Sequence, residues 1–249
     1  MHAWPLPRVL AHRCGGQLAP ENTLAGLDAA AACACRGVEF DVMLSADGQA
    51  VLIHDETLDR TTNGHGPVAE TALAQLRLLD AGSWFSSRFA GEGLPTLDAA
   101  LDRCVALELA VNLELKPATG HENLTGRVVA ELLRTRHGIE LPRLVLSSFS
   151  DIAIAAAREV MPGAIYGLLV EELPDNWCDR AAALGVHAIH ARSRTLTAAQ
   201  IESVHAAGYH MAVYTENDAA RAQALLAQGV GSVITDRPDR VREADMPAA

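Results

Sequence analysis

Short runs of β-forming residues alternate with longer Ala- and Leu-rich stretches along most of this 249-residue chain. Strands that alternate with helices are typical of parallel βαβ units, and eight such units can close into a barrel. The eight candidate strands are Arg8–His12, Gly37–Leu44, Leu109–Lys116, Arg143–Ser148, Ala164–Leu169, Val186–His190, Tyr209–Tyr214 and Gly231–Thr235. The pattern and the length predict an α/β fold, a TIM (β/α)₈ barrel, as a single domain over residues 1–249.

Capping residues mark several of the helices expected between these strands. Asn22 or Thr23 is placed to cap the first helix, and Thr96 to cap the helix Leu97–Leu107. Farther along, Asp151, Thr197 and Asn217 are expected to open the helices Ile152–Val160, Ala198–Ala207 and Asp218–Gln228.

One region departs from the alternating pattern. Asp47-Gly48 follows the second strand and precedes a ninth β-rich run, Gln49–His54, which is a hairpin signal. The residues that follow, at about 56–95, contain turn residues, a short predicted helix near Thr71–Leu79 and the aromatic-rich segment Trp84–Phe89. We interpret them as an insertion in the second βα loop, on the face where barrel enzymes build their active sites.

Composition limits the possible partners. The formal net charge of −11 argues against nucleic acid or an anionic membrane as a partner. The five scattered cysteines are typical of reduced thiols, and no signal or membrane-spanning segment is apparent. We therefore expect a cytoplasmic protein that acts on a small molecule.

Carboxylates alternate with apolar residues in two of the predicted strands. Strand side chains alternate between faces, so Glu39 and Asp41 should point together toward the barrel axis, and Glu114 should do the same from the third strand. Buried carboxylates repel one another, and a hard divalent cation (Mg²⁺, Ca²⁺ or Mn²⁺) is a usual partner. The alternative is a set of buried ion pairs with Lys116 and Arg13.

Two histidines lie at strand ends beside these acids. His12 ends the first strand, and His54 ends the hairpin, which places it roughly opposite Asp41. Histidine titrates near neutrality, so the pair is suited to general acid–base catalysis. Arg13 and Lys116 supply positive charge for an anionic phosphate.

Other polar residues near strand ends are open to two interpretations. His187 and His190 on the sixth strand are more typical of structural or pocket-lining residues than of metal ligands. Ser148 and Asp236 should lie on the active face, where each either contacts a substrate or ties loops together.

Several motifs resemble the glycerophosphodiester phosphodiesterase family, and most closely its bacterial cytosolic members. The matching segments are His12-Arg13-Cys14-Gly15-Gly16, Ala19-Pro20-Glu21-Asn22-Thr23, Glu39-Phe40-Asp41, His54-Asp55, Asp80-Ala81-Gly82-Ser83-Trp84-Phe85, Glu114-Leu115-Lys116-Pro117, Leu146-Ser147-Ser148-Phe149, Tyr214-Thr215-Glu216-Asn217 and Thr235-Asp236. The resemblance implies a TIM barrel with an insertion after the second strand, a divalent cation on Glu39, Asp41 and Glu114, and acid–base roles for His12 and His54. Cys14 is a departure, because most relatives carry glycine there.

These observations predict metal-dependent hydrolysis of glycerophosphodiesters to sn-glycerol 3-phosphate and an alcohol, with phosphate held by Arg13 and Lys116. Two alternatives remain at this point. One is a related barrel phospholipase that acts on membrane phosphodiesters, and the other is a non-catalytic barrel that binds glycerophosphodiesters.

Overall fold

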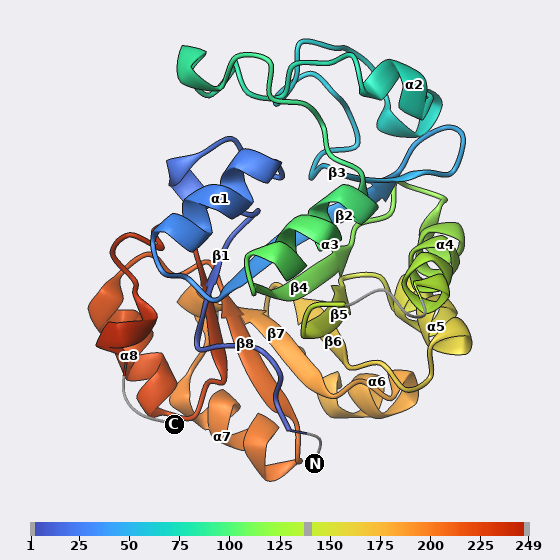
Figure 1. Cartoon of the computed structure of the whole chain (residues 1–249). Coiled ribbons are helices and arrows are strands. Elements are labelled where there is room, and N and C mark those ends of the chain that lie inside the picture. Colours follow the sequence, from blue (N-terminus) through green and yellow to red (C-terminus); the bar gives the residue numbers. More distant parts are fainter. Residues whose placement is uncertain (1–2, 137–140, 247–249) are drawn as a thin grey trace.

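In a computed structural model, which describes residues 3–136 and 141–246, eight parallel strands close into a barrel (Figure 1). Around the barrel the order is β1-β2-β4-β5-β6-β7-β8-β9, and β1 pairs with both β2 and β9. The strands are β1 Val9–Ala11, β2 Gly37–Leu44, β4 Ala110–Leu115, β5 Leu144–Ser148, β6 Tyr166–Val170, β7 Ala188–Arg192, β8 His210–Tyr214 and β9 Ser232–Thr235. The structure therefore confirms the TIM barrel expected from the sequence.

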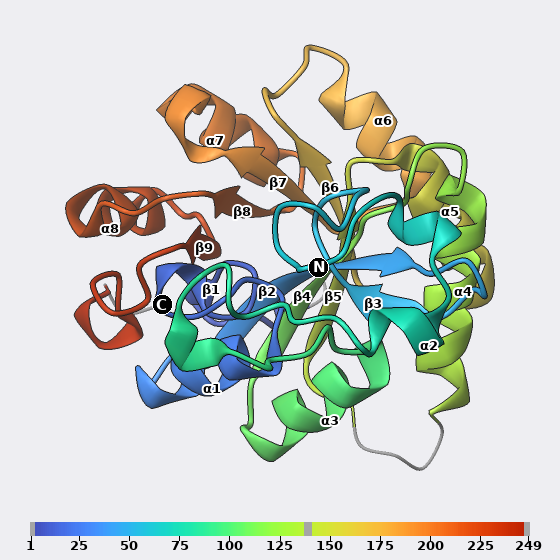
Figure 2. The same ribbon diagram turned by 90° about the horizontal axis from the view of Figure 1, so that it is seen from above.

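Helices surround the strands, as the view from above shows (Figure 2). They are α1 Leu24–Ala32, α3 Leu97–Ala106, α4 Glu122–Thr135, α5 Asp151–Val160, α6 Trp177–Leu184, α7 Ala198–Ala206 and α8 Ala219–Ala227. Thr23, Thr96 and Thr197 cap α1, α3 and α7 through their side chains, as expected. Neither α4 nor α6 has a side-chain cap, and no capping residue was predicted for either helix.

Two capping predictions were wrong, and of the two candidates for α1 only Thr23 is the cap. Asn22 directs its side chain to Asp41. Ser150 caps α5, and Asp151 is the first residue of that helix. Asp218 caps α8, whereas Asn217 is hydrogen-bonded to residues at the end of β9. Both asparagines form hydrogen bonds with residues that are distant in the chain, so their side chains are not available to cap a helix.

The two faces of each strand have different surroundings. Along β2 all eight residues are buried, but Val38, Phe40 and Val42 pack in the main core between the barrel and its helices. Their neighbours Glu39 and Asp41 consequently face the barrel axis. This is the alternation that the sequence predicted for the second strand.

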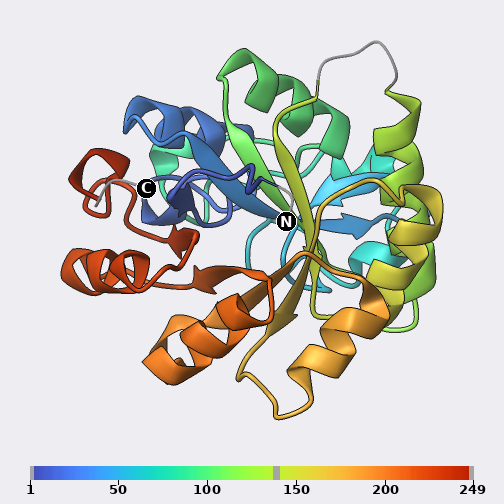
Figure 3. The ribbon, with the colours of Figure 1, turned by 90° about the horizontal axis from the view of Figure 1, so that it is seen from below.

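The lower end of the barrel is filled by apolar side chains. Leu10, Val145 and Ile234 form an interior cluster against which Trp4 packs. The indole of Trp4 donates a hydrogen bond to Ser232 Oγ at 2.8 Å and stacks on the ring of His210. Seen from below, the segment before β1 crosses this end (Figure 3). Functional side chains are therefore positioned at the opposite end, where the strands terminate.

The segment after β2 carries the predicted hairpin. Strand β3, Ala50–Leu52, pairs antiparallel with β2, and Ile53 N donates to Asp41 O at 3.2 Å. Between β3 and α3 lie the one-turn helix α2, Leu73–Leu76, and the 3₁₀ turns Val68–Glu70 and Ser87–Phe89. Helix α2 is shorter than the predicted Thr71–Leu79. The segment has its own small core, formed by Met43, Val51, Ile53, Leu58, Val68, Leu76, Leu94 and Ala118.

No helix among the described residues is long and apolar enough to cross a membrane. The assignment of the whole chain to one domain, with an insertion at about 56–95, stays a prediction.

Candidate active site

A cavity of about 610 Å³ opens at the upper end of the barrel. All seven site residues predicted from the sequence line it: His12, Arg13, Glu39, Asp41, His54, Glu114 and Lys116. They come from the ends of β1, β2 and β4 and from the hairpin, so barrel closure brings together residues that are far apart in the chain.

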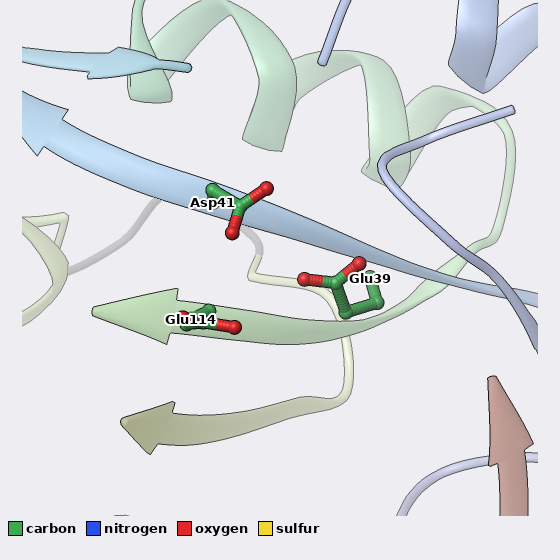
Figure 4. A group of neighbouring side chains, drawn as sticks. All are labelled: Glu39, Asp41 and Glu114. Carbon is green, nitrogen blue, oxygen red and sulfur yellow. The ribbon is translucent and has the colours of Figure 1, made fainter. Parts of the chain in front are cut away.

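Three carboxylates converge on the floor of this cavity (Figure 4). Glu39 and Asp41 project from β2, and Glu114 projects from β4, where it lies beside Asp41 in the strand register. One carboxylate oxygen of each residue lies within 4.8 Å of the others, and the three residues are only 3%, 1% and 7% exposed. Such a set of oxygen donors matches the requirements of a hard divalent cation.

The ion pairs of the alternative interpretation are present, but they do not satisfy the cluster. Lys116 Nζ lies 3.1 Å from Glu114 Oε1 and 3.7 Å from Asp41 Oδ1, and Arg13 Nε lies 3.8 Å from Asp41 Oδ2. Glu114 Oε1 is nevertheless buried without a properly oriented hydrogen bond. Burial and the neighbouring carboxylate of Asp41 raise the pKa of Glu39 to about 7 and that of Glu114 to about 8. Without a counter-ion the buried carboxylates therefore favour their protonated forms, and a divalent cation would stabilise the ionised forms in their place.

His12 is oriented by a carboxylate from the last strand. Its Nδ1–H donates to Asp236 Oδ1 at 2.6 Å, which leaves Nε2 on the cavity side, 3.9 Å from Glu39 Oε2. Burial lowers the pKa of His12, but the hydrogen bond to Asp236 and the charge of Glu39 outweigh burial and raise it overall. Asp236 is itself held, because its backbone N–H and its side chain both bond to Asn217.

The loop after β1 packs tightly against Asp236. Gly16 has φ +59°, and a Cβ at this position would lie 2.3 Å from the carbonyl oxygen of Asp236. The next residue, Gln17, donates its backbone N–H to the same oxygen at 2.7 Å. Only glycine allows this approach, so the loop fixes the backbone that carries the partner of His12.

His54 is oriented in a parallel way from the hairpin. Its Nδ1–H donates to Asp55 Oδ1 at 2.7 Å, and its Nε2 lies 2.9 Å from Lys116 Nζ. A charged lysine can only donate, so Nε2 is the acceptor and the ring is neutral. Burial lowers the pKa of His54, and the positive charges of Arg13 and Lys116 add to that effect against the opposing charge of Asp41.

A network of ion pairs beside the cavity holds these groups in place, and no role was predicted for it from the sequence. Glu21 accepts from Arg13 Nη1 at 2.8 Å and from both Nη1 and Nη2 of Arg60 at 2.8 Å. Arg60 also binds Asp55, the partner of His54. The network ties the loop after β1 to the hairpin, and Glu21 and Asp55 both belong to motifs that were visible in the sequence.

The far wall of the cavity was also missed. It is formed by side chains at the ends of β5 to β8: Phe149, Glu171, Arg192, Arg194 and Tyr214. Their positions directly at or after barrel strands were the available signal, since such positions build the active face.

Comparison with known proteins gives one consistent family. The model of the glycerophosphoryl diester phosphodiesterase family matches residues 12–240. A glycerophosphodiester phosphodiesterase of Caldanaerobacter subterraneus is 31% identical over 236 residues, which cover 93% of this chain and 94% of that protein. A glycerophosphodiester phosphodiesterase of Bacillus subtilis is 28% identical, with coverage of 92% and 83%.

Solved structures agree with these matches. An Oleispira antarctica phosphodiesterase in complex with the product sn-glycerol-3-phosphate superposes with a TM-score of 0.91 at 38% identity and covers 96% of both chains. A glycerophosphodiester phosphodiesterase of Agrobacterium tumefaciens has a TM-score of 0.80 at 29% identity, with coverage of 96% and 100%. The fold, the coverage and the sequence matches confirm both the family resemblance and the expected enzyme class: this chain belongs to the glycerophosphoryl diester phosphodiesterase family.

Proposed function

We propose that this chain hydrolyses glycerophosphodiesters to sn-glycerol 3-phosphate and an alcohol by acid–base catalysis between His12 and His54, with a divalent cation at the acidic cluster. The observation that carries the proposal is the pairing of each histidine with its own carboxylate, Asp236 or Asp55, on either side of that cluster. The product seen with the Oleispira relative supports the assignment of glycerol phosphate as a product.

Each histidine has a geometry suited to proton transfer. The carboxylate on Nδ1 holds the ring and directs Nε2 into the cavity as the atom to exchange a proton. Nε2 of His54 accepts from Lys116 Nζ there, so proton transfer at His54 requires that lysine to turn toward the phosphate. One histidine accepts the proton of the attacking group, and the other delivers a proton to the oxygen of the departing alcohol. If water attacks, glycerol phosphate forms directly; if the neighbouring hydroxyl of the glycerol arm attacks, a cyclic phosphate forms first and water then opens it. One ring gains a proton and the other loses one, so the total number of protons on the two histidines is unchanged by the reaction.

The phosphate is held by cations of the chain. Arg13 and Lys116 both line the cavity and lie close to the carboxylates, so they offset the negative charge that a phosphodiester brings. A Mg²⁺, Ca²⁺ or Mn²⁺ ion bound by Glu39, Asp41 and Glu114 would polarise a phosphoryl oxygen. The net charge of −11 supports a free small-molecule substrate over one presented on an anionic membrane surface.

The test uses the purified protein, glycerophosphocholine and a coupled assay with glycerol-3-phosphate dehydrogenase. His12→Ala and His54→Ala should each lower kcat by about 10²–10⁴-fold while circular dichroism stays unchanged. His65→Ala is the matched control, because His65 lies on the inserted segment, is 85% exposed and is paired with Asp59 outside the cavity. Near-normal turnover in either active-site variant would remove that histidine from the mechanism, and absence of glycerol phosphate with the wild type would reject the function.

A further inference from the structure

A second cavity, of about 350 Å³, adjoins the first. The two share three lining residues, His12, Arg13 and Asp236. Beyond this shared wall the second cavity lies between the loop after β1 and the inserted segment, and its other side chains include Glu21, Trp84 and Phe85. The candidate catalytic histidine His12 therefore borders two spaces of different character.

A phosphodiester has two ester arms on one phosphorus, and two adjoining spaces suit such a molecule. The acidic cluster, His54 and Lys116 line only the first cavity. A glycerol arm carries two hydroxyls, which match this polar space. With phosphate at the shared wall beside Arg13, the other arm extends into the second cavity.

The aromatic side chains of the second cavity form a fixed corner. The rings of Trp84 and Phe85 have centroids 5.7 Å apart and planes at 83°, and Phe85 makes a similar edge contact with Phe89. Trp84 donates its indole N–H to Ala81 O at 2.8 Å and is still 41% exposed. Its polar atom is thus satisfied within the segment, and an open aromatic face remains for a ligand.

The second space carries less unpaired positive charge than the first. The carboxylates of Glu21 and Asp236 line it, and they are paired with Arg13 and Arg60 and with His12. The far wall of the first cavity carries Arg192 and Arg194. Arg192 pairs with Glu171 at 3.1 Å, but no ion pair compensates Arg194 within the described residues. A positively charged arm is therefore better accommodated between Trp84 and Phe85 than at the arginine-bearing wall.

From these observations we propose that the second cavity is the subsite of the leaving alcohol, and that Trp84 and Phe85 make it prefer a quaternary ammonium alcohol such as choline to an uncharged one. The proposal rests on the proposed function and adds the substrate class that the site selects. Aromatic rings that meet at a right angle offer their faces to a trimethylammonium group, whereas a polyhydroxyl alcohol gains little from them.

The experiment compares kcat/KM for glycerophosphocholine and for glycerophosphoglycerol, whose leaving alcohol is uncharged. Trp84→Leu and Phe85→Leu should lower the value for glycerophosphocholine by about 3- to 30-fold and leave that for glycerophosphoglycerol within about 3-fold. Trp84→Phe, which restores an aromatic face, should recover most of the loss. Leu78→Ala is the neutral control, since Leu78 lies on the same segment and is 83% exposed.

Phe149→Leu is the comparison on the opposite wall, because Phe149 lines only the first cavity. An equal loss on both substrates in the Trp84 and Phe85 variants would overturn the proposal, and so would a choline-selective loss that appears only in Phe149→Leu. If the wild type releases no glycerol phosphate from either diester, the proposed function fails. In that case the affinity for glycerophosphocholine, measured by calorimetry for the wild type and the same variants, still tests the proposed subsite. An unchanged affinity in the Trp84 and Phe85 variants would overturn the subsite proposal.

Discussion

Replacing His190 with leucine should make the protein less sensitive to acid. His190 projects from β7 into the barrel and is fully buried, and neither ring nitrogen has a hydrogen-bond partner among the described residues. The ring is enclosed closely, since a Cβ on Gly167 would lie 2.6 Å from Nε2. Burial lowers the pKa of His190 to about 4 from the ordinary value of 6.5. The native protein therefore keeps this histidine neutral where the unfolded chain would protonate it.

The sign and the size follow from proton linkage. Between pH 6.5 and 4 the unfolded state binds more protons at this site than the native state does. The contribution of His190 to the free energy of unfolding therefore rises with pH and is lost as the pH falls toward 4. A pKa difference of about 2.5 corresponds in full to about 3 kcal/mol. About 2 kcal/mol of this appears between pH 7 and pH 4.5, because pH 4.5 is still above the native pKa.

Urea unfolding of the wild type and of His190→Leu at both pH values measures the effect. The wild type should lose about 2 kcal/mol more than the variant on going from pH 7 to pH 4.5, since titration of the carboxylates is common to both proteins and cancels. Leucine has a similar volume and gives up no hydrogen bond at this position. An equal loss in the two proteins would show that His190 is already protonated, or is partnered, in the native state, and would refute the reasoning.

Three further predictions concern activity. Asp236→Asn should lower kcat by about 10²–10³-fold at unchanged circular dichroism, because it removes the carboxylate that orients His12, and activity close to that of the wild type would argue against a positioning role. Chelation should abolish turnover, and Mg²⁺, Mn²⁺ or Ca²⁺ should restore it. Glu114→Gln should weaken metal affinity, measured by calorimetry, while the melting temperature changes little. Full activity of protein that elemental analysis shows to be metal-free would rule out the cation. Glycerophosphocholine should have a higher kcat/KM than phosphatidylcholine presented in vesicles that also contain anionic lipid, because the net charge of −11 opposes binding to such a surface. Equal cleavage of the intact lipid would favour the phospholipase alternative.

Much of the barrel and of its acidic cluster was accessible from the sequence because it depends on local periodicity. Alternation in Val38–Val42 and Val111–Lys116 assigns each side chain to one face of a strand, and both pleats occur as predicted. Parallel strands of one barrel end on one face, which was sufficient to expect that Glu39, Asp41 and Glu114 would meet. No start was predicted for α4 or α6, and neither helix has a side-chain cap, although Asn176, a residue type common at helix starts, stands at the N-cap position of α6.

Side-chain partners that lie far apart in the chain were decided by the tertiary structure alone. His12 and Asp236 are 224 residues apart, and their contact exists because β1 pairs with β9 when the barrel closes. Asn217 is held at that same junction, where hydrogen bonds to Thr235 and Asp236 outweigh its local preference for a helix cap. The second cavity likewise depends on how the inserted segment packs against the loop after β1. The sequence of neither segment by itself determines how far apart the two lie. Residue type and period thus determine which face a side chain takes, whereas closure of the sheet and docking of the loops determine which side chains it meets.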